Sequence, residues 1–162
     1  MTRPAASPSG PVVVGCSDTE SGRAALLFAA EEARLRGAAL RIVLAWEPAV
    51  DPDLPEFELD PDRQRARAGL AAQACRDLLA RHLGEQAPAA EIVTEQGPPA
   101  KAPLAASRGG ALLVIGSRSQ GLLTRPLQGS TTAEVIHRAQ LPVVVVPAPE
   151  DQRSTAGRQP PP

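Results

Sequence analysis

The sequence predicts an α/β fold in which an open parallel sheet of five strands carries helices on both faces. Short β-branched runs alternate along the chain with longer segments of helical periodicity, and this alternation is typical of right-handed β-α-β crossovers. The run ALLVIG at 111–116 is also apolar at every position. A strand of that kind is covered on both faces, as in a parallel sheet between two helical layers.

The N-terminal half supplies two strands and two long helices. PVVVG at 11–15 and ALRIVLAW at 39–46 are β-branched runs of strand length. Residues 21–38 and 62–84 have helical apolar recurrence, and each segment has a glycine at or near its end as a natural stop. We expect the buried helix faces to comprise Ala25, Leu26, Ala29, Ala30, Ala33 and Leu35 in the first and Leu70, Ala74, Leu78 and Leu79 in the second.

The C-terminal half completes the alternation. Further strands are predicted at 90–97, 111–116 and 142–147, with a short proline-initiated helix over 98–110. A last helix is predicted over 130–140, with Ser130, Thr131 or Thr132 as its N-cap.

Three segments contribute no regular element to this prediction. Residues 47–60 are rich in Pro and Asp and form a long connection, either a lid over a site or a plain insertion. Residues 1–10 and 148–162 lack the apolar content to fold, so we expect both ends to be disordered.

Composition excludes several classes of protein. A chain of 162 residues has room for one domain with a real core. The net charge is -1, so we expect no nucleic-acid partner. The longest apolar runs fall far short of the roughly 20 residues that a membrane span requires, and the first ten residues lack the apolar core of a secretory signal. We therefore expect a cytoplasmic protein that does not enter a membrane.

The cysteines and histidines do not form a metal-ligand spacing. Cys16 and Cys75 each fall within an apolar-patterned element, and free cysteine commonly behaves as a small hydrophobe. We expect both thiols to be buried without a redox or catalytic role. His82 and His137 lie on predicted helices beside arginines. We expect both histidines at the surface or at helix ends, and no metal site.

The candidate site is the loop GSRSQGLLTRPLQGST, residues 116–131. In doubly wound sheets, ligands bind beyond the carboxyl ends of the strands, where the winding reverses. For the order 3-2-1-4-5, this point lies between the first and fourth strands, so the loops after Gly15 and Ile115 meet there. Gly116, Gly121 and Gly129 give the second loop its freedom to turn, and Gly129 precedes a helix whose first N–H groups are unpaired.

Such a helix start is suited to an anion. The side chains that we expect to assist it are those of Arg118, Arg125, Ser130 and Thr131. Glycine at a strand end and serine at a helix start also occur for local backbone reasons, so this pattern alone leaves phosphate binding open. Other phosphate motifs are missing, because the chain has no G-x-x-x-x-G-K-[ST] and no G-x-G-x-x-G after the first strand. A P-loop hydrolase and a dinucleotide dehydrogenase are therefore not expected.

Three segments resemble the universal stress protein family across residues 11–147. They are PVVVGCSDTESGRAALLFAAEEA, LRIVLAWEP and LLVIGSRSQGLLTRPLQGSTTAEVIHRAQLPVVVVP. The resemblance implies one Rossmann-like domain with strand order 3-2-1-4-5 and a homodimer built through the last strand, here 142–147. Members of the family divide into those that bind ATP and those that do not.

The chain departs twice from the pattern of the ATP-binding members. Their signature is G-2x-G-9x-G-[ST], and here Gly116, Gly129 and Ser130 match while Ser119 replaces the second glycine. A Cβ there obstructs close approach of the backbone to phosphate, although a serine hydroxyl is also a donor. The aspartate that contacts the nucleoside end in those members is matched by Ser17.

Asp18 follows one place later, and a shift of one residue turns a side chain in another direction. Asp18 therefore either contacts the ligand or, with Ser21, caps the following helix. Ala45 matches a family position that lies against adenine through its backbone, and Ile115 directly precedes the first signature glycine.

Two hypotheses follow. The first is a regulatory module that binds ATP with Mg²⁺, with Gly116, Arg118, Gly129 and Ser130 around the phosphates and Ser17 or Asp18 near the ribose. The second is a dimeric interaction protein without nucleotide, which the two departures motivate. We predict no catalytic residues and at most very slow ATP hydrolysis, because efficient phosphoryl transfer needs a positioned metal carboxylate and residues 116–131 contain none.

Overall fold

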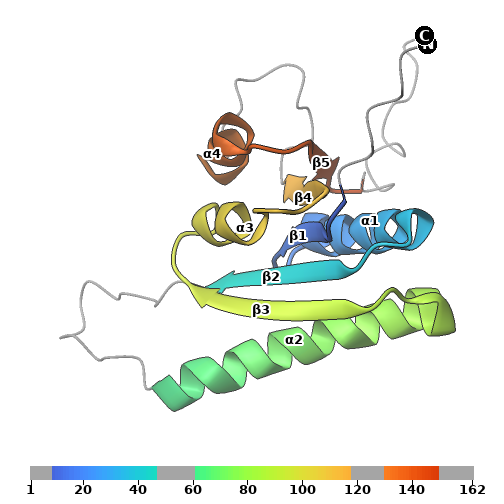
Figure 1. Ribbon diagram of the computed structural model, residues 1–162. Coiled ribbons are helices and arrows are strands. Elements are labelled where there is room, and N and C mark those ends of the chain that lie inside the picture. Colours follow the sequence, from blue (N-terminus) through green and yellow to red (C-terminus); the bar gives the residue numbers. More distant parts are fainter. Residues whose placement is uncertain (1–8, 47–60, 118–129, 150–162) are drawn as a thin grey trace, which may run out of the picture.

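Five parallel strands form one sheet in the order β3-β2-β1-β4-β5 (Figure 1). The computed structural model describes residues 9–46, 61–117 and 130–149. The strands are β1 (Val12–Cys16), β2 (Leu40–Trp46), β3 (Ala90–Gln96), β4 (Leu112–Ser117) and β5 (Val143–Pro147). The predicted fold class and strand order are confirmed.

Helices cover both faces of the sheet (Figure 1). They are α1 (Glu20–Arg36), α2 (Pro61–Leu83), α3 (Lys101–Ala106) and α4 (Ser130–Arg138), with a 3-10 turn at Gly84–Gln86. α1 and α2 pack on one face, and α3 and α4 pack on the other. This division follows from the right-handed crossovers of a doubly wound sheet.

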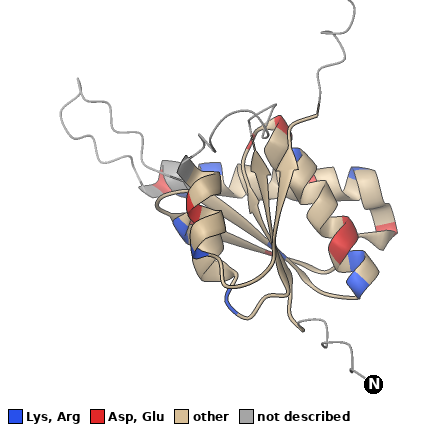
Figure 2. Cartoon of the chain, turned by 90° about the horizontal axis from the view of Figure 1, so that it is seen from above, with Lys and Arg blue, Asp and Glu red and all other residues tan. Residues whose placement is uncertain are grey.

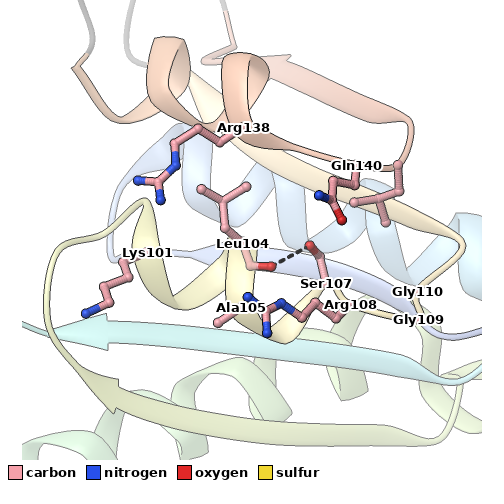
Figure 3. A pocket seen from close by; sticks show the side chains of 10 residues that line it. Lys101, Leu104, Ala105, Ser107, Arg108, Gly109, Gly110, Arg138 and Gln140 are labelled. Carbon is pink, nitrogen blue, oxygen red and sulfur yellow. Dashed lines mark hydrogen bonds between the residues drawn. The ribbon is translucent and has the colours of Figure 1, made fainter.

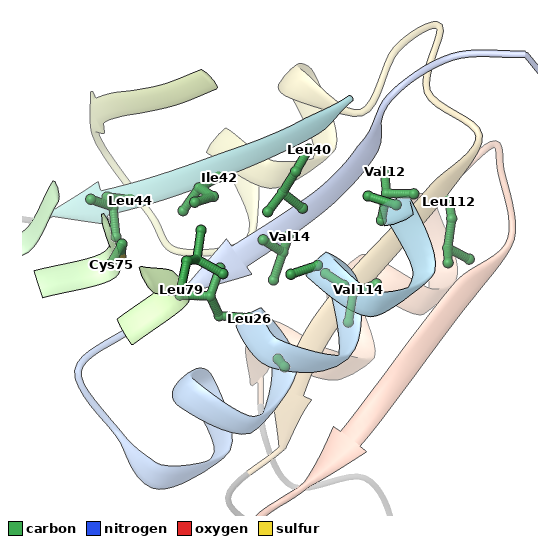
Figure 4. Packing of buried hydrophobic residues seen from close by; sticks show 14 of the residues in the cluster. Val12, Val14, Leu26, Leu40, Ile42, Leu44, Cys75, Leu79, Leu112 and Val114 are labelled. Atoms are coloured by element: carbon green, nitrogen blue, oxygen red, sulfur yellow. The ribbon is translucent and has the colours of Figure 1, made fainter. Parts of the chain in front are cut away.

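The pleat of the strands divides the core into two layers. Val12 and Val14 face α1 and α2, while Val13 between them faces α3. In the parallel register Val12 is paired with Leu40, so neighbouring strands present apolar side chains to the same layer (Figure 4). Each such side chain contributes about 1.5–3 kcal/mol when it is fully buried. The prediction that residues 111–116 form a strand covered on both faces is confirmed, because residues 112–115 are all buried.

The apolar faces of α1 and α2 are only partly as predicted. Leu35 is 69% exposed and Leu70 is 72% exposed, and Ala74 is exposed as well. Leu35 lies two residues beyond buried Ala33, which is about 200° around a helix. Leu70 and Ala74 lie on either side of buried Ala72 at the same angular distance. The buried face of α2 consists of Ala72, Cys75 and Leu79 among its described side chains.

Charged residues of both signs are interspersed along the helices (Figure 2). Several form i,i+3 or i,i+4 pairs, such as Arg36 with Glu32 at 3.0 Å. Exposed pairs of this type add only tenths of a kcal/mol each. None of the helices within 9–46, 61–117 and 130–149 combines the length and the apolar character of a membrane span. The predictions for residues 47–60 and for most of the two chain ends fall outside the described residues.

Candidate functional site

The carboxyl ends of β1 and β4 lie side by side at the centre of the sheet. Gly15 is paired in register with Ile115. β2 and β3 follow β1 on one side of this pair, and β5 follows β4 on the other side, so the winding of the sheet reverses here. The structure therefore brings together the starts of the two loops that the sequence analysis selected. This point is where ligands bind in doubly wound sheets.

The turn from β1 into α1 is held by hydroxyl groups. Thr19 has an extended backbone, and its side-chain oxygen accepts a hydrogen bond from the backbone N–H of Gly22 at 3.0 Å. The Ser17 hydroxyl is exposed and lies 2.9 Å from the Thr19 hydroxyl. Thr19 is therefore the N-cap of α1, and the prediction that Asp18 and Ser21 cap this helix is wrong. Asp18 precedes the cap position and Ser21 already lies inside the first turn.

Asp18 is bound to the outside of α1. Its side chain is 96% exposed and its carboxylate lies 2.9 Å from the guanidinium of Arg23. Because water screens so exposed an ion pair, the pair itself contributes little stability. In this pair the carboxylate of Asp18, the residue after Ser17, lies beside α1.

Two glycines allow α1 to approach the strand ends closely. A Cβ on Gly22 would lie 2.2 Å from the carbonyl oxygen of Ser17, and a Cβ on Gly116 would lie 2.5 Å from the carbonyl oxygen of Ser21. Both contacts are with backbone, which has little freedom to move away. Gly116, the first residue of the signature, thus has a packing role that the sequence analysis did not foresee. The two small residues Ser21 and Gly22 are the feature of the sequence that could have predicted this close packing.

The other predicted site residues differ in how they are placed. Ala45 is the last residue but one of β2, and Ile115 lies two residues before the end of β4. Both side chains pack in the apolar layer under α3. Ser130 is the first residue of α4, Thr131 is half-buried and Thr132 is buried. The remaining predicted residues, Arg118, Ser119, Gly121 and Gly129, lie outside the described part of the chain.

The two cysteines meet beneath this turn. The sulfur of Cys16, at the end of β1, lies 3.9 Å from the sulfur of Cys75 in α2. Their hydrogen bond, together with burial, raises the pKa of the Cys16 thiol. The same bond lowers the pKa of Cys75. The sequence analysis missed this contact because 59 residues separate the two positions.

A groove of about 760 Å³ lies elsewhere, between α3 and α4 (Figure 3). Its walls carry Lys101, Arg108 and Arg138 around the apolar side chain of Leu104. The segments 107–110 and 138–141 that line it precede β4 and β5, so most of the groove lies toward the amino ends of these strands. It is therefore distinct from the predicted nucleotide site at the carboxyl ends. In the part of the chain that the structure describes, no three His, Cys, Asp or Glu side chains gather to hold a metal ion.

Comparison with known proteins settles the family. The family model described as the universal stress protein family matches residues 9–147. The chain belongs to the universal stress protein family. A universal stress protein of Mycobacterium tuberculosis is 31% identical over 140 residues, which cover 83% of this chain and 44% of that protein. The chain spans about half the length of the curated relatives that it matches.

Solved structures of the family share the fold. A universal stress protein in complex with cAMP is 24% identical, with a TM-score of 0.63, and the match covers 87% of this chain and 99% of that one. A universal stress protein from Archaeoglobus fulgidus in complex with dAMP is 23% identical, with a TM-score of 0.54, and the match covers 86% of this chain and 98% of that one. The identification that the sequence resemblance implied is confirmed.

Proposed function

We propose that this universal stress protein is a cytoplasmic regulatory module that binds an adenine nucleotide, ATP in the first instance, beyond the carboxyl ends of β1 and β4. The observation that carries the proposal is the exposed hydroxyl turn at Ser17, which lies beside the start of the 116–131 loop at the point where the sheet reverses its winding. Two structures with the same fold are described as complexes with the adenine nucleotides cAMP and dAMP.

The proposed contacts divide between the two loops. Ser17 or Asp18 lies near the ribose, the backbone of Ala45 lies against adenine, and Gly129 with Ser130 and Thr131 surrounds the phosphates at the start of α4. Gly116, Arg118, Ser119 and Gly121 complete the loop, and Ile115 leads into it. Mg²⁺ would arrive on the phosphates of ATP, because no cluster of metal-ligating side chains is found within the described residues. The proposed role is regulatory and not catalytic, because residues 116–131 contain no carboxylate that could position a metal ion for phosphoryl transfer.

Thermal melting with added nucleotide tests the proposal. We expect millimolar ATP with Mg²⁺ to raise the melting temperature by several degrees, since a ligand that binds only the folded state stabilises it. GTP is the matched control, because it has the same phosphates on a different base. An equal shift with GTP would contradict selectivity for the adenine base, and no shift with ATP would contradict nucleotide binding altogether.

A second candidate function, that of a dimeric interaction protein without nucleotide, has one observation in its favour. β5 is the last strand of the described sheet and pairs only with β4 on its inner side. Residues 143–146 are valines and are only half-buried. An apolar edge strand of this kind favours pairing with a second copy of the chain. We propose a homodimer through 142–147 in either case.

Light scattering tests this candidate. We expect a mass of twice the 16.8 kDa of the chain at micromolar concentration. If the dimer forms and ATP produces no thermal shift, the second function replaces the first. A mass of one chain would contradict the dimer, and release of a tightly held nucleotide on denaturation would contradict a nucleotide-free role.

A further inference from the structure

The two cysteines of the chain lie within contact distance although they belong to different elements, β1 and α2. Cys16 is the last residue of β1 and is half-buried, and Cys75 lies in the middle of α2 with 6% of its surface exposed. Their sulfurs are 3.9 Å apart. Cys75 packs in the apolar layer beside Leu79 and Leu44 (Figure 4). Only these two cysteines occur in the chain, so each has one intramolecular partner.

We propose that Cys16 and Cys75 form a reversible disulfide when the protein meets a peroxide. The bond would join the end of β1 to α2. A disulfide has a sulfur–sulfur distance of about 2.05 Å, so the sulfurs must approach by about 1.9 Å from their 3.9 Å separation. Rotation of the side chains about Cα–Cβ moves each sulfur on this scale. α2 is also held to the sheet by few large side chains, which permits a small shift of the helix.

The surroundings couple the two thiols. Their hydrogen bond, together with burial, raises the pKa of Cys16, and the same bond lowers the pKa of Cys75, which also lies near the guanidinium of Arg76. The contact therefore favours a thiolate within the pair, and the thiolate is the form that attacks peroxide. Cys16 is the more exposed of the two thiols.

The reaction balances with one peroxide. One thiol of the pair ionises and its thiolate attacks an oxygen of hydrogen peroxide. The O–O bond breaks, the leaving hydroxide takes up the proton lost on ionisation as water, and this cysteine becomes a sulfenic acid. The sulfur of the second thiol then attacks the sulfenic sulfur, the S–O bond breaks, and the leaving hydroxide takes the proton of the second thiol as water. Two thiols are oxidised by two electrons in total, and one peroxide is reduced to two molecules of water. An added dithiol reverses the bond by exchange.

The bond would act on the turn that precedes α1. Cys16 is followed directly by Ser17, and its sulfur lies 3.8 Å from the carbonyl oxygen of Gly22 in the first turn of that helix. A disulfide at this point fixes α2 against the base of the hydroxyl turn. The inference does not depend on nucleotide binding, because it concerns only the two thiols and the elements that bring them together.

The test is a thiol count on the native, reduced protein before and after hydrogen peroxide. We expect the count to fall from two to zero per chain, the intact mass to fall by about 2 Da, and non-reducing electrophoresis to show a single-chain band. Peptide mapping should find Cys16 linked to Cys75, and dithiothreitol should restore both thiols. Two remaining thiols, a disulfide between chains, or independent oxygen adducts on each cysteine would overturn the proposal.

Two single variants sharpen the result. In Cys16→Ser and in Cys75→Ser, peroxide should add oxygen to the remaining thiol without the loss of about 2 Da, because the partner thiol is gone. Cys16→Ala and Cys75→Ala repeat the comparison if a serine variant does not fold by circular dichroism. A remaining thiol that does not react with peroxide in either variant would contradict oxidation at this pair.

Discussion

Glycine at position 22 lets the first turn of α1 lie directly against the end of β1. The carbonyl oxygen of Ser17 occupies the space where a Cβ would stand, at 2.2 Å. Gly116 does the same for β4 against Ser21. These contacts place α1 close against the turn that follows β1 and against β4. Close backbone packing at Gly22 and Gly116 therefore determines how α1 lies at the candidate site.

Replacement of Gly22 by alanine should destabilise the fold strongly. The new methyl group meets backbone atoms of Ser17, and overpacking of this kind costs about 3 kcal/mol. Gly69→Ala is the matched control, because a Cβ on Gly69 in α2 meets nothing within 4 Å. It should be neutral or stabilise by about 0.5–1 kcal/mol. Urea unfolding followed by circular dichroism measures both, and equal stability of the two variants would contradict the packing role.

Ser17→Asp restores the residue that ATP-binding relatives are expected to carry at this position. We expect the dissociation constant for ATP to fall about tenfold, since a hydrogen bond to a charged group is worth about 1.5–3 kcal/mol. Asp18→Asn is the control, because Asp18 is turned to solvent and paired with Arg23. Calorimetry on both variants decides the matter. A large loss of affinity in Asp18→Asn would instead assign the ribose contact to Asp18.

Roles that depend on neighbouring residues in the chain were easier to predict from the sequence than contacts between distant residues. Gly37 was correctly predicted to end α1, and it adopts a left-handed conformation with φ of 61°, which glycine alone adopts freely. The Thr19 cap was missed because three neighbouring polar residues compete for one position within four residues of chain. The contact between Cys16 and Cys75 was missed for a different reason. It depends on how α2 lies on the sheet, and no local pattern encodes that.

At the scale of elements, the two long helices are held very differently. α1 buries seven residues against the centre of the sheet, from Ser21 to Ala33. α2 is longer, with 23 residues, but its buried described residues are Ala72, Cys75 and Leu79. Two of these are small, so the helix contributes little apolar contact per turn. The sequence predicted both helices and misassigned Leu35, Leu70 and Ala74, because apolar residues occur on several sides of these alanine-rich helices.

Amide hydrogen exchange should report this difference. We expect the amides of α2 N-terminal to Ala72 to exchange at least roughly tenfold faster than those in the middle of α1, because local opening follows the amount of buried contact. Mass spectrometry of peptides from the two helices measures the rates in one sample. Protection of this part of α2 equal to that of α1 would contradict the account of its packing.

The whole molecule follows from the alternation of strands and helices. An apolar strand at the centre and right-handed crossovers leave few topologies open, and the family resemblance specified the order that the structure has. The position of the candidate site follows from that order alone. Its ligand does not, because affinity depends on the side chains and backbone of 118–129 and on the two departures at Ser17 and Ser119. The fold was thus predictable to the level of topology, and so was the pairing of β1 with β4 from which the two loops start; the site itself stays a prediction.

Calorimetric titration of ATP with Mg²⁺ into nucleotide-stripped protein tests the central claim most directly. The comparison is between the native chain, Gly129→Val in the proposed phosphate loop, and Gly69→Val on the open surface of α2. We predict binding to the native chain and to Gly69→Val, and its loss in Gly129→Val, because a branched side chain obstructs the approach of backbone to phosphate. No binding to the native chain, or equal binding to all three, would contradict a nucleotide site in this loop.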